Sequence, residues 1–181
     1  MKGGNGMLTQ ARLKEVVHYD PDIGVFTWLT RVVREEWNRT DRSWNGRYAG
    51  KRAGSLSVHL GYRILGIDDH AQYEHRLAWL YMTGEWPAEY IDHINLIKSD
   101  NRWGNLRAAS RSQNKANVPL GLKNTSGYKG VCYSPRHEKW KAQIQVDRRN
   151  RHLGLFNTPE DAHAAYCFAA KSHFGEFSRV S

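Results

Sequence analysis

The pattern of apolar and polar positions is most regular between residues 126 and 181. Residues 128–133, 139–146 and 151–156 are short apolar-rich stretches separated by turns, and the middle one alternates strictly. Thr158 and Pro159 can then open a helix whose small residues cover the apolar face. The pattern predicts a small three-stranded antiparallel sheet plus one helix. The apolar positions of the middle strand are Trp140, Ala142, Ile144 and Val146, and its polar positions are Lys141, Gln143 and Gln145.

The first two thirds of the chain show shorter and more mixed signals, which predict an α+β arrangement. Residues 31–54 are polar, with six arginines and no clean period, and are expected to form a long loop or an irregular arm. Whether that arm contacts a DNA backbone is left open. The other expected elements are a helix capped by Thr9 and ending near Tyr19, a strand at 25–29, strands within 55–67 with turns at Gly61 and Gly66, and a helix at 75–84 stopped by Gly84.

Residues 90–117, YIDHINLIKSDNRWGNLRAASRSQNKAN, combine aspartates, one histidine and many asparagines. Asn95 and Asn101 are expected to form turns, because asparagine favours them. A strand, a loop, a second strand and a helix in so short a stretch can bring a strand residue and a helix residue to one point. The expected elements are a strand at 90–94, a turn-rich loop at 96–104, a strand at 105–108 and a helix at about 111–118 with Ser110 as its N-cap.

The side chains of this stretch favour metal-assisted chemistry over a simple turn-rich connector. Asp92 offers a carboxylate and Asn114 an amide oxygen, and magnesium prefers hard oxygen ligands of this kind. Histidine titrates near neutrality, so His93 could take a proton from a water that attacks phosphorus. Each residue alone is weak evidence, because a lone histidine is more often structural. Their order and spacing together carry the prediction.

Charge is distributed unevenly along the chain. Residues 1–91 carry 12 basic and 11 acidic side chains, whereas residues 92–181 carry 15 and 7, within a net charge of +9. A basic second half indicates a polyanion as partner, and a basic surface kept for solubility is the plainer alternative. The lysines and glutamines on the polar face of the middle strand are side chains that can bind phosphates and base edges. Residues 118–127, rich in Pro, Gly, Asn and Ser, are expected to be a linker.

Cysteine content and hydropathy exclude several classes. Cys132 and Cys167 form no CxxC pair, so neither a zinc site nor a disulfide framework is expected. No apolar run approaches the ~20 residues of a membrane span, and the first ten residues lack the apolar core of a signal peptide. A cytoplasmic protein without a membrane partner is expected.

The C-terminal part resembles the plant APETALA2/ethylene-response-factor DNA-binding domain. The matching residues are 128–131 (YKGV), 139–144 (KWKAQI), 153–156 (LGLF), 158–162 (TPEDA), and the ending from Ala169-Ala170 to Phe174-Gly175. The resemblance implies a sheet laid in the major groove of DNA. Where that family often has arginines, this chain has Cys132, Ser134 and Gln145, so the target sequence does not carry over. The expected DNA contacts in this part are Lys129, Arg136, Lys139, Lys141, Gln143, Gln145, Arg149, Arg151 and His152.

Residues 92–95 (DHIN), 100–107 (DNRWGNLR) and 112–117 (SQNKAN) resemble the HNH endonucleases, in the phage homing type whose last motif member is asparagine. The preceding HRLAWLYMTGEWP (75–87) is also typical of these proteins. The resemblance implies a ββα-metal core over 90–117, a phage or mobile-element setting, and magnesium as cofactor, with manganese as a substitute. It implies His93 as general base, Asn105 as the residue that holds the loop and the histidine, Asp92 and Asn114 as metal ligands, and Arg107, Arg111 and Asn117 as DNA-backbone contacts or plain surface and capping residues.

Together these observations predict an N-terminal mixed segment leading into an HNH nuclease core (1–117), a linker (118–127) and a DNA-binding domain (128–181). The expected activity is metal-dependent hydrolysis of phosphodiester bonds in double-stranded DNA. One motif gives one active site, so a monomer should nick, and a dimer on DNA is left open. The alternatives are a non-catalytic, sequence-specific DNA-binding regulator on a nuclease-derived fold, and an RNA-directed nuclease, which the groove-reading sheet disfavours.

Overall fold

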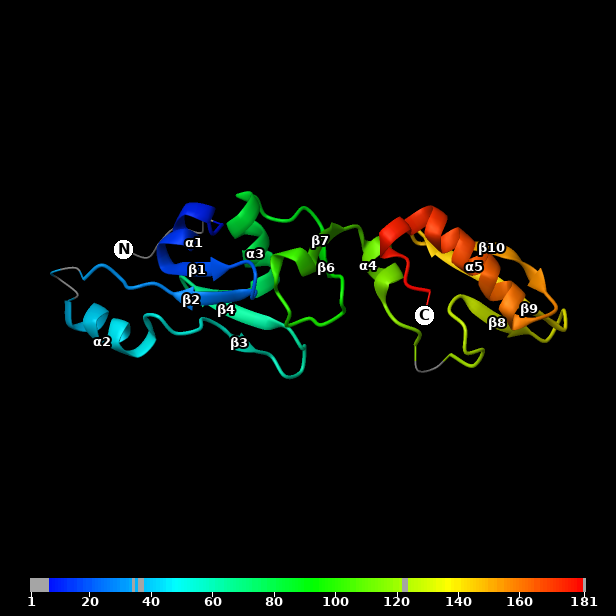
Figure 1. Cartoon of the computed structure of the whole chain (residues 1–181), viewed down its shortest axis with the longest axis horizontal. Helices are drawn as coiled ribbons and strands as arrows, with labels where there is room; N and C mark the ends of the chain where they lie inside the picture. The colour runs from blue at the N-terminus through cyan, green and yellow to red at the C-terminus, as the bar shows by residue number, and fades with distance from the viewer. Residues whose placement is uncertain (1–6, 34, 36–37, 122–123, 181) are drawn as a thin grey trace. The chain divides into compact units, whose positions relative to one another are not determined.

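The computed structural model describes residues 7–180, except 34, 36, 37, 122 and 123 (Figure 1). The chain divides into two compact units, residues 1–107 and residues 108–181. Both are mixed α+β, with small antiparallel sheets and helices, which confirms the expected fold class at that level. None of the helices in the described ranges has the length and apolar character that crossing a lipid bilayer requires.

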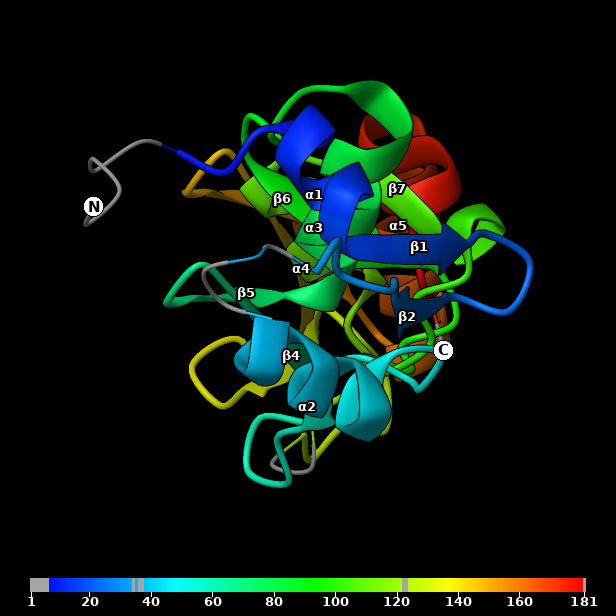
Figure 2. The ribbon, with the colours of Figure 1, turned by 90° about the vertical axis from the view of Figure 1, so that its left-hand side faces the viewer.

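The first unit is built from short strands and helices around one apolar core. β1 pairs with β2 as a hairpin, and β3, β4 and β5 form an antiparallel meander. α1 packs against α3 (Figures 1 and 2), and the core between them includes Leu13, Leu77 and Leu80. The elements are α1 (Gln10–Val16), β1 (Val17–Asp20), β2 (Val25–Trp28), α2 (Asn38–Tyr48), β3 (Ser55–Leu56), β4 (Arg63–Ile67), β5 (His70–Tyr73), α3 (Glu74–Thr83), β6 (Tyr90–His93), η2 (Trp103–Asn105) and the first residues of β7 (Leu106–Ala109).

The expected helix from Thr9 is shorter than predicted. Thr9 does cap it, with its hydroxyl accepting from the Arg12 N–H, but α1 ends at Val16. Val17 and Tyr19 are fully buried while His18 between them is exposed, which is the period of a strand. Pairing with β2 therefore outweighs the continuation of the helix.

Residues 31–54 were expected to be a loop or an irregular arm, and this prediction is wrong for residues 38–48, which form α2. The helix has no apolar stripe of its own. Trp44 packs edge-on against Trp28 and lies under the Arg31 guanidinium, 3.8 Å from ring centre to Cζ. Asn45 exchanges hydrogen bonds with the backbone of Arg31 through both ends of its amide. The helix thus depends on tertiary contacts that periodicity does not reveal.

The hairpin turn expected at Gly66 lies two residues later. Gly66 is inside β4, and the turn is made by Asp68 and Asp69, both with positive φ (49° and 65°). Aspartate tolerates this left-handed backbone better than most residues. The helix at 75–84 is confirmed, because α3 ends at Gly84 in the left-handed conformation.

The second unit contains the predicted sheet and helix. β8, β9 and β10 form an antiparallel sheet in the order β10-β9-β8, and α5 lies along one face of it (Figure 1). Thr158 caps α5 with Pro159 in its first turn, as expected. The elements are α4 (Arg111–Asn117), β8 (Val131–Ser134), β9 (Lys139–Val146), β10 (Arg149–Phe156), α5 (Pro159–Phe174) and η3 (Gly175–Phe177).

Helix α4 is part of this second unit. Ser110 caps it through a full capping box with Gln113, as the sequence predicted for its N-terminus. Ala116 is buried in the same cluster as Ile144 and Tyr166. The expected boundary at 118–127 thus differs from the division into compact units after Arg107; as a statement about independent domains it stays a prediction.

Candidate active site

Strand β6 places two functional side chains next to each other in a buried position. Ile91, Asp92 and His93 are all buried, and the side chains of Asp92 and His93 belong to residues with only 3% and 5% of their surface exposed. β6 pairs with β7, and the Ile94 N–H continues the ladder by donating to the Asn105 carbonyl at 3.0 Å. A short strand at the edge of the core therefore presents a carboxylate and an imidazole together.

Asp92 is held by Arg107, which comes from the start of β7. The Arg107 Nε and Nη2 atoms lie 2.9 and 2.8 Å from Asp92 Oδ2. The two side chains are only 16% and 4% exposed, so the ion pair is largely shielded from water. The sequence left two roles open for Arg107, a DNA-backbone contact and a plain surface charge. Its guanidinium instead orients the neighbouring carboxylate, and a phosphate contact by this residue stays a prediction.

Asn105 organises the loop that follows β6. Its Oδ1 accepts from the Asn95 N–H at 3.0 Å, and its Nδ2 donates to Asn95 Oδ1 at 3.0 Å and to the Asp100 carbonyl at 2.8 Å. Asn95 also accepts from the Ile97 N–H at 2.9 Å, so it makes the turn that was expected. These contacts are of the kind that the resemblance implies for Asn105, a residue that holds the loop through the backbone.

Asp100 and Arg102 close the same loop. Both Arg102 Nε and Nη2 contact Asp100, at 2.9 and 2.6 Å, and Asn95 Nδ2 donates to Asp100 Oδ2 at 2.6 Å. The hydrogen bonds from Arg102 lower the pKa of Asp100 to about 2. The loop therefore carries a permanent carboxylate that is already engaged within it.

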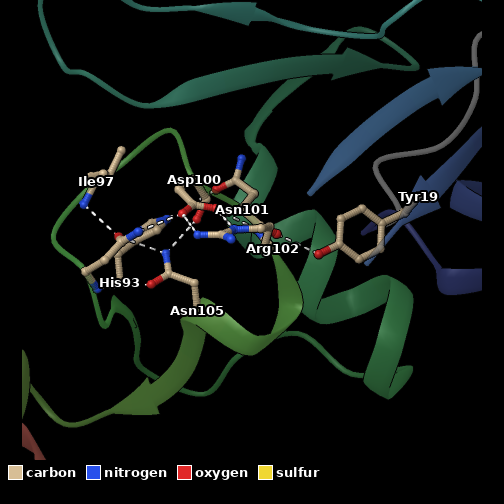
Figure 3. A network of polar contacts seen from close by, with 8 residues as sticks. Tyr19, His93, Ile97, Asp100, Asn101, Arg102 and Asn105 are labelled. Atoms are coloured by element: carbon tan, nitrogen blue, oxygen red, sulfur yellow. Dashed lines mark hydrogen bonds and ion pairs between the residues drawn. The ribbon is translucent and has the colours of Figure 1, made fainter. Parts of the chain in front are cut away.

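His93 is in contact with a side chain that the sequence assigned only to a turn. Asn101 is buried, and its Oδ1 lies 3.2 Å from His93 Nε2 (Figure 3). Asn101 Nδ2 donates in turn to Glu74 Oε2 at 3.2 Å. Burial lowers the pKa of His93, and the contact with Asn101 and the charge of Asp92 oppose that shift without cancelling it. The neutral imidazole is therefore favoured at neutral pH.

A second histidine lies beside His93. The rings of His75 and His93 meet edge to face with centroids 5.1 Å apart, and Tyr62 and Tyr73 flank His75 at 5.1 and 5.5 Å. Burial lowers the pKa of His75 to about 3, so this ring is neutral. His75 Nδ1 is buried and has no hydrogen-bond partner among the described residues. The ring of His75 is thus packed among aromatic side chains.

The donor set suits a hard cation held by few protein ligands. Asp92 supplies carboxylate oxygen next to a neutral histidine. Within the described ranges, no group of three or more His, Cys, Asp or Glu side chains could hold a metal. A site with one carboxylate would have to be completed by amide, water and phosphate oxygens, which is how magnesium is usually bound. A divalent metal at Asp92 therefore stays a prediction.

Three further predicted residues lie on α4, in the second unit. Arg111 is exposed and Asn114 half-buried. Asn117 is buried, with its Oδ1 accepting from Arg179 Nε at 3.4 Å, so the alternative of a structural role fits it better than a contact with phosphate. The approach of Asn114 to Asp92 stays a prediction.

The open face of the C-terminal sheet is defined by strand register. Gln143 and Gln145 on β9 are paired with His152 and Asn150 on β10, and directly paired residues point to the same face. Arg149 and Arg151 are paired with Val146 and Ile144, which belong to the core face. Both arginines are exposed, but they do not share the face of the glutamines. Their predicted DNA contact would have to come from the sheet edge.

Lys129 also departs from the expected role. Its ammonium group donates to the carbonyls of Ala116, Val118 and Arg179 at 2.6 to 2.9 Å. Burial lowers the pKa of Lys129 to about 8. Its three donors are used within the second unit, so its position does not support the predicted DNA contact. Arg136, Lys139 and His152 are exposed, and Lys141 is half-buried on the open face.

Comparison with known proteins indicates which class of protein this site resembles. Residues 72–116, which contain α3, β6, the loop and most of α4, match the family described as HNH endonuclease. This part of the chain is similar to HNH endonuclease domains, and the similarity supports a DNA-cleaving enzyme over a non-catalytic regulator.

Two viral proteins are similar over longer stretches. The chain is 28% identical over 106 residues to Protein 3.8 of Escherichia phage T7, covering 58% of this chain and 87% of the phage protein. It is 30% identical over 133 residues to an uncharacterized HNH endonuclease of Acanthamoeba polyphaga mimivirus, covering 72% of this chain. The aligned part is 64% of the mimivirus protein, so the chain spans less than two thirds of that relative.

Proposed function

We propose that the protein is a divalent-metal-dependent endonuclease that hydrolyses phosphodiester bonds in double-stranded DNA, with its chemistry at Asp92 and His93. The observation that carries the proposal is the buried Asp92–His93 pair on β6, within the segment that matches the HNH endonucleases. The ββα-metal arrangement, the homing type and the His-Asn-Asn form of the motif are parts of the same proposal.

His93 acts as the general base. A base must be unprotonated before it can accept a proton, and burial favours the neutral ring by lowering the pKa of His93. The imidazole takes a proton from water as the water oxygen attacks phosphorus. The P–O3′ bond then breaks, the departing O3′ takes up a proton from solvent, and a 3′-hydroxyl and a 5′-phosphate are left. Asn105 supports this step by holding the loop that follows the histidine.

Asp92 is the carboxylate ligand of the metal, and Asn114 supplies an amide oxygen. The proposed ion is Mg²⁺, with Mn²⁺ as a substitute, because both ligands are hard oxygen donors. A bound metal of this kind would offset the negative charge that develops on the phosphate and the departing oxygen. Arg107 fixes the orientation of the Asp92 carboxylate through Oδ2.

The C-terminal unit supplies the DNA-binding surface. Lys139, Lys141, Gln143 and Gln145 lie on the strand that the APETALA2/ethylene-response-factor resemblance places in the major groove, and His152 is paired with Gln143. Lysines contribute phosphate contacts and glutamines can bind base edges. A monomer with one such site nicks DNA, and cutting of both strands needs a second copy or a second visit.

The decisive experiment is nicking of supercoiled plasmid by the purified protein. Wild type with Mg²⁺ or Mn²⁺ should form open circles, and EDTA should stop the reaction. His93→Ala should lower the rate at least about 100-fold, since general-base catalysis contributes at least that factor. His59→Ala, at an exposed histidine, is the control and should keep the wild-type rate. A wild-type protein that binds DNA but nicks with neither metal would rule the proposal out.

A separate measurement tests the DNA-binding surface. Lys141→Ala should reduce the slope of log K against log salt by about 0.9, the value for one lost phosphate contact on duplex DNA. Lys171→Ala, at an exposed lysine of α5 and off the sheet, should leave the slope unchanged. Equal slopes for Lys141→Ala and wild type would show that Lys141 makes no phosphate contact and that another surface binds the DNA.

A further inference from the structure

Three side chains connect the core of the first unit to His93. Asn101 stands in the middle, with Oδ1 3.2 Å from His93 Nε2 and Nδ2 3.2 Å from Glu74 Oε2. Asn101 is 1% exposed and Glu74 is fully buried. Bulk water therefore does not compete for these hydrogen bonds, and each donor and acceptor is determined by its protein partner.

The Glu74 end sets the direction of both hydrogen bonds. Arg63 Nε lies 3.1 Å from each Glu74 oxygen, and Arg63 Nη2 donates to the Gly54 carbonyl at 3.1 Å. Burial raises the pKa of Glu74, and the contacts with Arg63 reduce that rise without cancelling it. Two charge-assisted contacts from one guanidinium fit the ionised carboxylate, which can only accept. Asn101 must therefore turn its Nδ2 toward Glu74 and its Oδ1 toward His93.

The backbone of Asn101 is held from the other side. Its carbonyl accepts from the Tyr19 hydroxyl at 2.6 Å (Figure 3), and Tyr19 is buried in the core. The turn after β1 also touches this backbone, because a Cβ at Gly24 would overlap Asn101 and Arg102. The backbone of Asn101 thus cannot easily move away to follow the histidine. The histidine must adapt to the amide.

We propose that Asn101, fixed by Glu74, is a positioning residue that selects the His93 tautomer with its hydrogen on Nε2. An amide oxygen only accepts, so His93 Nε2 has to donate to it. The lone pair of the neutral ring is then on Nδ1, which becomes the atom that accepts the proton from water. The inference rests on the proposed function, in which His93 is the base, and it names the atom that does the work.

The tautomer can be measured without any catalytic assay. Nitrogen-15 NMR of histidine-labelled full-length protein, metal-free and near pH 8, where unperturbed histidines are neutral, distinguishes the two neutral ring forms. His93→Ala identifies the His93 signals. Wild type should show the Nε2–H form. Asn101→Leu should lose that preference, while His59→Ala, at an exposed histidine, should keep it. A wild-type His93 in the Nδ1–H form would overturn the proposal.

Kinetics separate positioning from a merely structural role. Asn101→Leu should lower kcat for nicking about 10- to 100-fold with KM little changed, the usual effect of losing a residue that orients another. In a His93→Ala background the same substitution should change the residual rate less than about twofold, since it acts through His93. An equal loss in both backgrounds would mean that Asn101 only supports the fold. His59→Ala, at an exposed histidine, should leave kcat near wild type.

A rescue pair guards against a variant that does not fold. Asn101→Asp combined with Glu74→Gln keeps the shapes of both side chains. The amide introduced at position 74 then donates to the carboxylate introduced at position 101. That carboxylate still presents an acceptor oxygen to His93. The pair should keep the Nε2–H form and recover at least about a third of the kcat lost by Asn101→Leu. If the pair folds and recovers nothing, the positioning role is wrong. If the wild-type protein does not nick DNA, both the proposed function and this inference are wrong. If the wild-type protein nicks DNA and Asn101→Leu nicks at the same rate, only this inference is wrong.

Discussion

At the scale of single residues, the candidate site depends on partners from other parts of the first unit. Asp92 is held by Arg107, and His93 is linked through Asn101 to Glu74 on α3. Asn101 was expected to form a turn, and Arg107 to contact the DNA backbone or to be a plain surface charge. Both are better understood as supports of the two side chains on β6. Removing such a support should affect stability more than removing an exposed ion pair.

Arg107→Ala should lower the free energy of unfolding by about 3 kcal/mol. The substitution leaves the buried Asp92 carboxylate without its guanidinium partner, and breaking a buried pair from one side is costly. Arg102→Ala removes the partner of Asp100 at a pair whose guanidinium is 55% exposed, and it should have a smaller effect. Urea denaturation followed by tryptophan fluorescence measures both. Equal effects of the two substitutions would show that burial of the Asp92 pair is not what matters.

His75 should make the folded state sensitive to acid. Its pKa is about 3 when folded and near 6.5 when unfolded. The unfolded state therefore binds more protons between these values, and stability falls as the pH drops from about 6.5 toward 3, by up to about 1.4 kcal/mol per pH unit. His75→Phe should flatten this part of the stability curve, and His59→Phe, at an exposed position, should not. Urea denaturation from pH 7.5 to 4.5 provides the comparison, and parallel curves for His75→Phe and wild type would contradict it.

At the scale of elements, close packing and strand register decide what each face presents. α5 covers the sheet with small residues such as Ala162 and Ala170, and Tyr166 lies directly against Gly130. On the sheet itself, register assigns Arg149 and Arg151 to the face of Ile144 and Val146. From the sequence, these arginines and the glutamines of β9 were expected to form one DNA-binding surface. The strand register shows that the arginines and the glutamines belong to different faces of the sheet.

Gly130→Ala should destabilise the second unit more than Gly127→Ala. The two glycines have nearly the same φ, 73° and 77°, so both substitutions carry a similar backbone cost of about 1 to 2 kcal/mol. A Cβ at Gly130 would overlap the Tyr166 ring, whereas a Cβ at Gly127 meets no heavy atom within 4 Å. The additional loss at Gly130 should be about 1 to 3 kcal/mol. Thermal denaturation of the two variants tests it, and equal melting temperatures would refute it.

At the scale of the whole molecule, helix α4 is assigned differently by sequence and by packing. By sequence it closes the HNH motif, and by packing it belongs to the C-terminal unit. Ala116 is buried with the residues of the C-terminal core, and the carbonyls of Ala116 and Val118 accept from Lys129. The linker expected at 118–127 therefore does not mark the edge of the packed unit.

A fragment of residues 108–181 should be more stable than a fragment of residues 118–181. The shorter fragment exposes the surface that Ala116 covers and takes one carbonyl, that of Ala116, from the half-buried Lys129 ammonium. A loss of about 1 to 3 kcal/mol follows from an unsatisfied charged donor. Lys129→Met in the longer fragment should reduce the difference between the two. Equal unfolding midpoints in urea would place the domain boundary at the linker after all.

Local sequence was sufficient wherever a short-range rule decides the structure. The alternation of β9, the Thr158-Pro159 start of α5, the Ser110 capping box and the Gly84 stop of α3 are each determined by residues within one turn or one strand. The motif spacing likewise indicated the class of enzyme, because strand, loop and helix are consecutive in the chain.

Tertiary structure alone decided the contacts between distant residues. Helix α2 exists through Trp44 on Trp28, Arg107 serves Asp92, and Asn101 faces Glu74 from 27 positions away. The hydrophobic periodicity of the sequence does not reveal such pairs. A buried polar group forms hydrogen bonds with whichever partner the fold places near it, and that partner can be far away in the sequence. The sequence by itself therefore singled out Asp92 and His93 as candidates, and the fold determined that Arg107 holds the carboxylate and that Asn101 contacts the imidazole.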